Sequence, residues 1–151
     1  MSRLKPSNAI DDYMPVIREE LTKADQSQGL ILLALYCLDN TDRLQNFLPL
    51  YWTHLSSPAS THPHLMASLK AMTDFAIRLD LTSISLSEDC SFTYSLFLSR
   101  VMELMLTERS SLRIMAIESL CRLLYHNRVG EDLRVNCLVR LLFLWWETST
   151  E

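Results

Sequence analysis

The sequence is poor in glycine, with only Gly29 and Gly130 in 151 residues. Phosphate-binding turns of the Rossmann and P-loop types need several glycines close together, so the sequence excludes both kinds of nucleotide site. The same scarcity argues against an all-β protein, because tight turns between strands favour glycine. The sequence therefore predicts an all-α fold.

Cysteine pairs and long apolar runs are also missing. Cys37, Cys90, Cys121 and Cys137 show no C-x-x-C spacing, so the zinc and thioredoxin signatures are absent. All but Cys90 fall within apolar helical patterns, and we interpret them as small reduced core residues, typical of a nuclear or cytosolic compartment. The N-terminus lacks the apolar segment of a signal peptide. The longest apolar run, inside residues 29–38, is about ten residues and too short to span a bilayer.

The charge of the chain is unevenly distributed. The net charge is −4, which is unlike the basic footprint of a free-standing nucleic-acid binder. Residues 100–146, however, carry seven arginines, no lysine and five carboxylates. The C-terminal third is therefore locally basic in an otherwise acidic chain.

Apolar residues recur at three- and four-residue intervals, which predicts helices along most of the chain. The third helix contains Pro49, which should kink it, and the fourth begins at a Thr61 cap with Pro63 in its first turn. The first helix is expected to be capped by Asp11 or Asp12 and the sixth by Ser110 or Ser111. The expected ranges are 12–24, 28–38, 42–56, 62–80, 92–107, 111–125 and 131–146.

The predicted helices group into pairs with a spacing of roughly 40 residues, the period of HEAT and armadillo arrays. We predict a HEAT-type α-solenoid of about three helix pairs: residues 29–56, 63–107 and 111–146. The alternative is a compact helical bundle. The expected organisation is a flexible N-terminus (1–11), a helical segment (12–147) with an internal loop (82–91) whose serines could accept phosphate, and a C-terminal tail (148–151).

No arrangement typical of an enzyme is present. His62 and His64 flank Pro63 but have no further ligand at metal-binding spacing, so we interpret them as surface-loop histidines. Neither a G-x-S-x-G elbow nor an H-E-x-x-H motif occurs. Adjacent carboxylates point apart along a helix and are better explained by solubility and helix dipoles. We therefore predict no catalytic residue, no metal and no cofactor.

Two groups of residues are candidates for binding. Arg109, Arg113 and Arg122 could contact DNA phosphates or an acidic partner, and the competing interpretation is a solvated face paired with nearby glutamates. The inward-facing apolar stripe of the last helix is predicted to include Leu138, Leu142 and Trp145. In the helix before it, Cys121 is predicted to face inward. That last helix is too apolar for a terminal cap, so Phe143, Trp145 and Trp146 are predicted to pack on a following repeat or to form a partner interface.

The C-terminal helices resemble a known family. Residues 112–124 (LRIMAIESLCRLL) resemble the L-R-x-x-A-x-E-G-L-x-K-L helix of the condensin HEAT subunit called CAP-G, with Ser119 in place of the usual glycine and Arg122 in place of lysine. Residues 138–146 (LVRLLFLWW) are similar to the family segment L-x-R-L-x-L-L-W-Y, in the same order and at the same separation. Residues 29–38 and 65–81 resemble two upstream helices of the family.

The resemblance implies a non-catalytic α-solenoid that binds the kleisin subunit of condensin, holds DNA together with it, and acts in mitotic chromosome condensation. The ATPase then belongs to the SMC subunits, which are reached through the kleisin. The implied location is the nucleus and the chromosomes, with the cytoplasm as a second compartment, and no membrane or small-molecule substrate is implied. The alternative is a HEAT-like or armadillo-like adaptor unrelated to chromosomes, and a small helical enzyme is the least favoured option.

Overall fold

The computed structural model describes residues 13–81 and 91–149, which contain seven α-helices and no strand. The all-α prediction is confirmed. The predicted cap of the first helix at Asp11 or Asp12 is wrong, because Tyr13 is its N-cap. Residues 1–11, predicted to be flexible, residues 82–90 of the internal loop and the last two residues of the tail lie outside the described residues. The helices are α1 (Met14–Thr22), α2 (Ser27–Asp39), α3 (Leu44–Ser56), α4 (His62–Arg78), α5 (Tyr94–Leu104), α6 (Ser110–Tyr125) and α7 (Glu131–Ser149), with a short 3-10 turn η2 (Thr41–Arg43) before α3.

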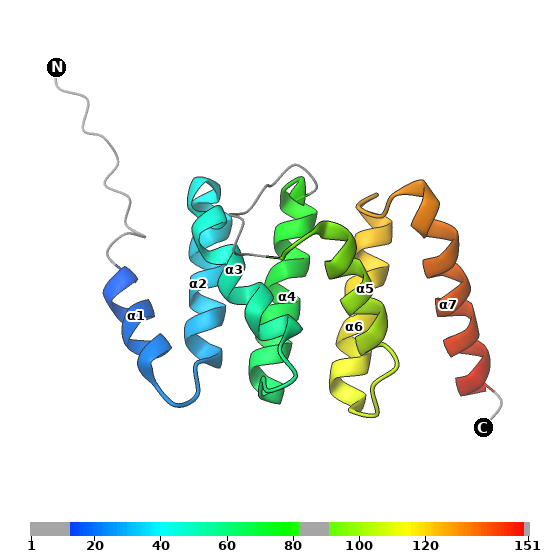
Figure 1. The fold of residues 1–151 in the computed structure, drawn as a ribbon, viewed down its shortest axis with the longest axis horizontal. Coiled ribbons are helices and arrows are strands. Elements are labelled where there is room, and N and C mark those ends of the chain that lie inside the picture. The colour runs from blue at the N-terminus through cyan, green and yellow to red at the C-terminus, as the bar shows by residue number, and fades with distance from the viewer. Residues whose placement is uncertain (1–12, 82–90, 150–151) are drawn as a thin grey trace, which may run out of the picture.

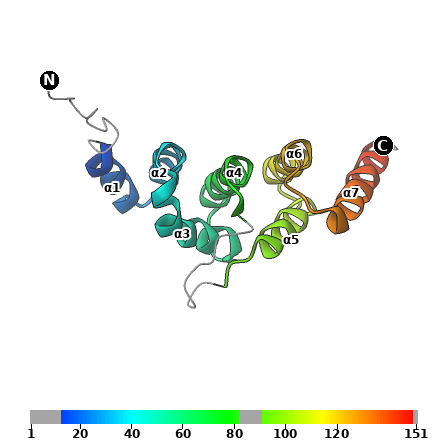
Figure 2. The same ribbon diagram turned by 90° about the horizontal axis from the view of Figure 1, so that it is seen from above.

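The helices stand side by side from α1 at one end of the molecule to α7 at the other (Figure 1). In the view from above, α2, α4 and α6 form one row, and α3 and α5 form a second row against it (Figure 2). Each helix of the first row packs directly on the next, α2 on α4 and α4 on α6. This two-layer stack is the helical repeat fold that the sequence predicted.

The boundaries of the helix pairs differ from the prediction by one helix. Among helices that follow one another in the chain, α1 packs extensively on α2, α3 on α4, and α5 on α6, whereas α4 and α5 make few contacts. The predicted pairs 29–56, 63–107 and 111–146 are therefore wrong in their boundaries. The number of pairs stays at three, and α7 is left as a single helix beside α6.

Aromatic side chains hold the centre of the stack. Tyr51 of α3 is fully buried, its hydroxyl donates a hydrogen bond to the Leu30 carbonyl (2.6 Å), and its ring meets that of Phe75 edge-on at 5.3 Å. These contacts tie α2, α3 and α4 together. Trp52 packs in the same edge-on manner against Phe92, which precedes α5 (5.5 Å).

Local sequence signals place several helix ends correctly. Pro15 and Pro63 lie in the first turns of α1 and α4, where a missing N–H costs nothing, and Thr61 is the N-cap of α4. Pro49 lies inside α3. The predicted cap at Ser110 or Ser111 is wrong, because Arg109 is the N-cap of α6 and both serines are in its first turn.

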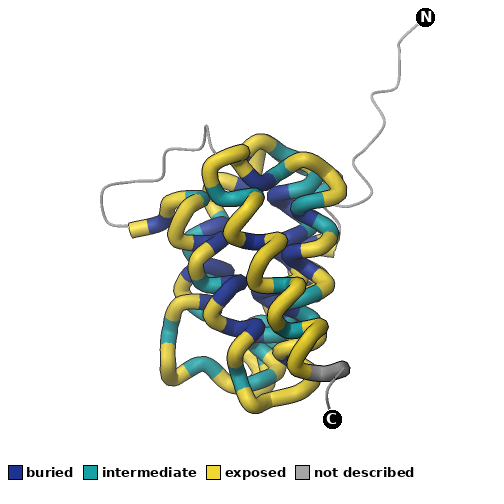
Figure 3. Tube along the Cα trace, turned by 90° about the vertical axis from the view of Figure 1, so that its right-hand side faces the viewer, coloured by how far each residue is buried: buried dark blue, intermediate teal, exposed yellow. Residues whose placement is uncertain are grey.

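Two predictions of burial are also wrong. Cys121 is exposed, although Cys37 and Cys137 are buried as predicted. In α7, the predicted inward residues Leu138, Leu142 and Trp145 are exposed, since α7 packs on a single flank of the stack. Seen from the α7 end, the exposed residues dominate the surface of this helix (Figure 3). The α2 helix is buried by α1, α3 and α4 on several sides and exposes Ile31, Leu32 and Leu35 on the remaining one.

Candidate functional site

The N-terminus of α6 gathers positive charge. Arg109 caps the helix and Arg113 follows one turn later; both are exposed, and neither makes an ion pair among the described residues. Between them lies Ser111, whose hydroxyl is 2.9 Å from Nε2 of His62 in α4. The free N–H groups of the first helical turn add a partial positive charge. This corner can attract phosphate or carboxylate groups.

Arg122, the third predicted contact, is separated from this corner. It lies nine residues after Arg113, about two and a half helical turns, so the two side chains project from opposite sides of α6. Its guanidinium donates to Oδ1 of Asp74 in α4 at 2.6 Å, and both side chains are partly exposed. The structure therefore brings Arg109 and Arg113 together and assigns Arg122 to an ion pair between α4 and α6.

Asp74 could not have been found from the sequence. It is 48 residues away from Arg122 and carries no motif. The competing interpretation paired the arginines with Glu103, Glu108, Glu118 and Glu131. Glu103 does form an ion pair, with Arg100 at 2.8 Å, but Arg122 pairs with Asp74. Arg128 instead donates two hydrogen bonds to the carbonyl of Ile77 (3.2 and 2.8 Å).

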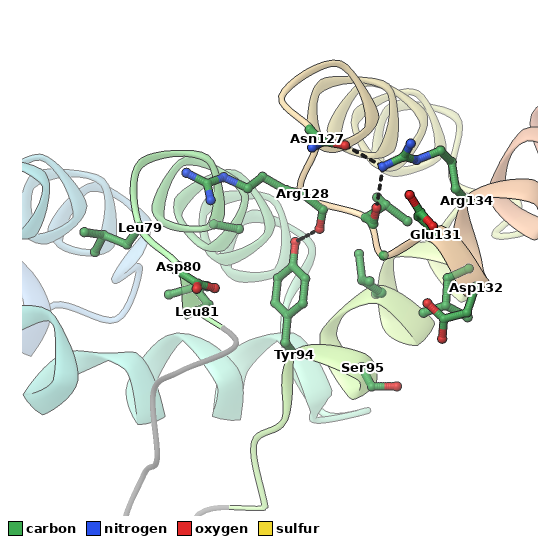
Figure 4. Close-up of a pocket in the computed structure, with 15 residues that line it drawn as sticks. Leu79, Asp80, Leu81, Tyr94, Ser95, Asn127, Arg128, Glu131, Asp132 and Arg134 are labelled. Carbon is green, nitrogen blue, oxygen red and sulfur yellow. Dashed lines mark hydrogen bonds between the residues drawn. The ribbon is translucent and has the colours of Figure 1, made fainter.

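A cavity of about 620 Å³ lies where the end of α4, the start of α5 and the α6–α7 turn meet (Figure 4). The Tyr94 hydroxyl donates to the Arg128 carbonyl at 2.7 Å, and burial raises the pKa of Tyr94 to about 12. Arg134 is held by Asn127 and the Val129 carbonyl. Arg128 binds the Ile77 carbonyl at the end of α4 and Arg134 binds the Val129 carbonyl of the α6–α7 turn, so both arginines join neighbouring repeats. The carboxylates of Asp80, Glu131 and Asp132 border the cavity.

A smaller apolar groove of about 220 Å³ runs between α1 and α2. Its walls include Tyr13 and Val16 on one side and Leu32 and Leu35 on the other, all of them exposed. This groove offers an apolar docking surface on the same row of helices as α6.

The outer face of α7 presents the predicted aromatic group. Phe143, Trp145 and Trp146 are 64–65% exposed, and Phe143 and Trp146 line an open apolar hollow with Val139 and Leu142. The structure thus brings these three side chains onto the end of the stack, remote from Arg109 and Arg113.

The two histidines beside Pro63 are not surface-loop residues as predicted. Both lie in the first turn of α4 and are partly buried, and Nε2 of His64 accepts a hydrogen bond from the Gln26 amide (3.2 Å). The ring of His54 meets that of His64 at 5.1 Å, and burial lowers the pKa of His54. In residues 13–81 and 91–149, no group of three His, Cys, Asp or Glu side chains is placed to hold a metal ion.

Within the same ranges, no helix combines the length and apolarity that crossing a membrane requires.

Comparison with known proteins supplies one match. The model of the family described as nuclear condensing complex subunits, C-terminal domain, matches residues 14–151. No curated protein and no solved structure matches the chain. The match covers all seven helices, including both the basic corner at α6 and the apolar outer face of α7.

Proposed function

Because the chain belongs to the family of nuclear condensin complex subunits, we propose that it is a non-catalytic scaffold of a condensin-like complex that binds a kleisin and, together with it, DNA. Its place of action is then the mitotic chromosome. A subunit of this family works with complex partners, and the repeat fold supplies an extended surface for them rather than an enclosed pocket.

The observation that carries the DNA part of the proposal is the basic corner of α6. Arg109 and Arg113 are one turn apart, exposed, and located where the helix dipole also favours anions. Contacts of this kind hold the phosphate backbone without reading sequence. The net charge of −4 means that such a corner acts as a local contact within a complex, not as a free-standing DNA-binding domain.

Arg122 is expected to contribute less to phosphate binding than the other two arginines. Asp74 already neutralises much of its charge at 2.6 Å, so a phosphate would have to compete with that carboxylate. We therefore expect Arg122 to matter less to DNA binding than Arg109 and Arg113.

The groove between α1 and α2 is the surface at which we expect the kleisin to bind. Leu32 and Leu35 present apolar area there, which a partner segment with apolar side chains would bury. The groove lies at α1 and α2 and the basic corner at α6, with α4 between them, so a partner segment and DNA would occupy separate parts of the surface (Figure 2).

A co-expression pull-down against the kleisin subunit of condensin, with and without DNA, tests this function. The wild-type chain should co-purify with the kleisin, and Leu35→Glu should abolish co-purification, since it places a charge in the groove. Ile114→Glu, an equally polar change at an exposed site of α6, is the matched control. A folded chain that fails to bind the kleisin contradicts the proposal.

The DNA contact is tested on the kleisin complex with the double variant Arg109→Glu/Arg113→Glu. It should lower DNA retention and reduce the slope of log affinity against log salt by about 2, one for each lost phosphate contact. Arg18→Glu on α1 makes the same charge change at an exposed site and should leave retention near wild type. Unchanged retention in the double variant would remove the basic corner from the function.

The second candidate is a helical adaptor unrelated to chromosomes. The apolar groove favours it, because a groove of this kind can bind a partner segment without DNA. Binding of a partner that is indifferent to DNA and to the Arg109 and Arg113 changes would support this alternative.

A further inference from the structure

Two arginines, one in α5 and one just after α6, reach back to the helix ends of the preceding pair. Arg100 donates from Nε to the Leu55 carbonyl at 2.9 Å, in the last turn of α3. Arg128 donates from Nε and Nη2 to the Ile77 carbonyl at 3.2 and 2.8 Å, in the last turn of α4. Both helices of the second pair are therefore capped at their C-terminal ends by arginines of the third.

The carbonyls at these helix ends are strong acceptors for a cation. The last four carbonyls of a helix have no N–H partner within the helix, and the helix dipole concentrates partial negative charge there. A guanidinium that donates to such a carbonyl forms a charge-assisted hydrogen bond, about twice as strong as a bond between neutral groups. Each arginine thus satisfies a carbonyl that its own helix leaves without a partner.

Arg128 is itself held in place from two sides. The hydroxyl of Tyr94, the first residue of α5, donates to the Arg128 carbonyl at 2.7 Å (Figure 4). The chain turns at Asn127, whose φ is 57°, and the N–H of Arg128 donates to the Leu123 carbonyl at 2.8 Å. This is the Schellman arrangement that ends many helices. It fixes the backbone from which the Arg128 side chain extends.

The two sides of the boundary between the second and third pairs are packed differently (Figure 2). On one side, α4 and α6 pack on each other as extensively as the two helices within a pair. On the other side, α3 and α5 touch at few residues, and α4 and α5 make few contacts. A rotation of the third pair about the α4–α6 contact would therefore change the α3–α5 side with little loss of buried surface.

The α3–α5 side also has room for such a rotation. The cavity of about 620 Å³ lies there, between the end of α4 and the start of α5. The aromatic contact on this side joins Trp52 to Phe92, which belongs to the segment before α5 rather than to the helix itself. Arg100, Arg128 and Tyr94 are thus the groups that tie α5 and the α6–α7 turn to the second pair.

From these observations we propose that the boundary between the second and third pairs is a bending point of the stack, and that Arg100 and Arg128 form a clamp that holds its curvature. The α4–α6 contact is the pivot, and the clamp lies on the α3–α5 side. The curvature of a helical repeat stack shapes the surface that it offers to partners, so the clamp controls that surface. The clamp is independent of the kleisin and DNA contacts proposed above.

Spin-label distances measured on the full chain test the clamp. The double variant Arg100→Gln/Arg128→Gln removes both guanidinium groups and keeps part of each apolar stem. Arg18→Gln on α1 makes the same change at an exposed site away from the boundary and is the matched control. Cys90 and Cys121 are changed to alanine throughout, so that the introduced cysteines carry the labels.

Two pairs of labels report on the two sides of the boundary. Asn46→Cys on α3 and Ser99→Cys on α5 report on the clamp side, and Lys70→Cys on α4 and Glu118→Cys on α6 report on the pivot side; all four sites are exposed. Packing angles between helices vary by about 15–20°, and a rotation of that size about an axis roughly 10 Å away moves α5 by about 3 Å. The double variant should lengthen the Asn46–Ser99 label distance by about this amount and leave the Lys70–Glu118 distance unchanged.

Circular dichroism establishes that each variant keeps the helical content of the wild type, and the two single variants replace the double variant if it does not. An unchanged Asn46–Ser99 distance in a folded variant overturns the clamp, as does an equal lengthening in Arg18→Gln. Equal lengthening of both label distances overturns the pivot, because the pairs would then separate as a whole. Single variants that both unfold also overturn the proposal, since the arginines would then maintain the fold rather than its curvature.

Discussion

Helices α4 and α7 are similar in length and apolar content, yet they have opposite environments. Among the seventeen residues of α4, nine are buried, because α2, α3 and α6 pack around it. In α7, Cys137 is the one buried residue among the described side chains, and its aromatic residues are exposed. The comparison shows that the number of neighbouring helices, rather than the apolarity of a segment, sets its burial in this fold.

The largest expected contrast is between two phenylalanines. Phe75→Ala in α4 removes a fully buried ring that meets Tyr51, and it should lower the free energy of unfolding by about 3–5 kcal/mol. Phe143→Ala in α7 removes an exposed ring and should change it by less than about 0.5 kcal/mol. Urea denaturation measures both, and equal losses would contradict the comparison.

The two glycines provide the next contrast. A Cβ on Gly29 would lie 2.8 Å from the backbone nitrogen of Leu21, so Gly29→Ala should force α1 and α2 apart and cost about 1–3 kcal/mol. At Gly130, before α7, the added methyl would meet the flexible Asp132 carboxylate.

Gly130→Ala should therefore stay within about 0.5 kcal/mol of the wild type in the same denaturation experiment. If Gly29→Ala were equally mild, the close packing of α1 on α2 would be disproved.

The buried thiol of Cys37 makes the free energy of unfolding depend on pH in the alkaline range. Burial raises the pKa of its thiol to about 12, from an ordinary value of 9 in the unfolded chain. The stabilising contribution is complete below pH 9 and is lost as the pH rises towards 12, by about 1.4 kcal/mol per pH unit.

Cys37→Ala should reduce this alkaline loss, measured as the free energy of unfolding at pH 8, 9.5 and 10.5. Cys121 is exposed and partial burial raises the pKa of its thiol only in part, so Cys121→Ala is the comparison variant and should change the slope less than Cys37→Ala does. An unaltered slope in Cys37→Ala would contradict the burial of this thiol.

The smallest effect concerns the ion pair between α4 and α6. Asp74 and Arg122 are 25% and 38% exposed, so solvent weakens their attraction. A double-mutant cycle with Asp74→Ala and Arg122→Ala should give a coupling of about 0.5 kcal/mol. The same cycle for Asn136 and Arg140, within α7, should give a smaller value. A coupling of zero for the first pair would mean that it does not join the two helices.

The fold was largely predictable, and the candidate site only in part. Periodic apolar residues and prolines such as Pro63 gave the helices and several of their ends, because these signals act within one or two turns. The closeness of Arg109 and Arg113 was predictable for the same reason, as they are four residues apart on one helix. The partner of Arg122 was not, because Asp74 lies on another helix and only packing brings it near.

The sequence by itself determined that the chain is helical, where the helices run, and that the C-terminal third concentrates arginine and large aromatic side chains. The tertiary structure decided which helices form pairs, which apolar faces are covered, and why Trp145 and Leu35 are exposed while Tyr51 is buried. The physical reason is that helix formation depends on neighbours along the chain, whereas burial depends on contacts between residues that are tens of positions apart.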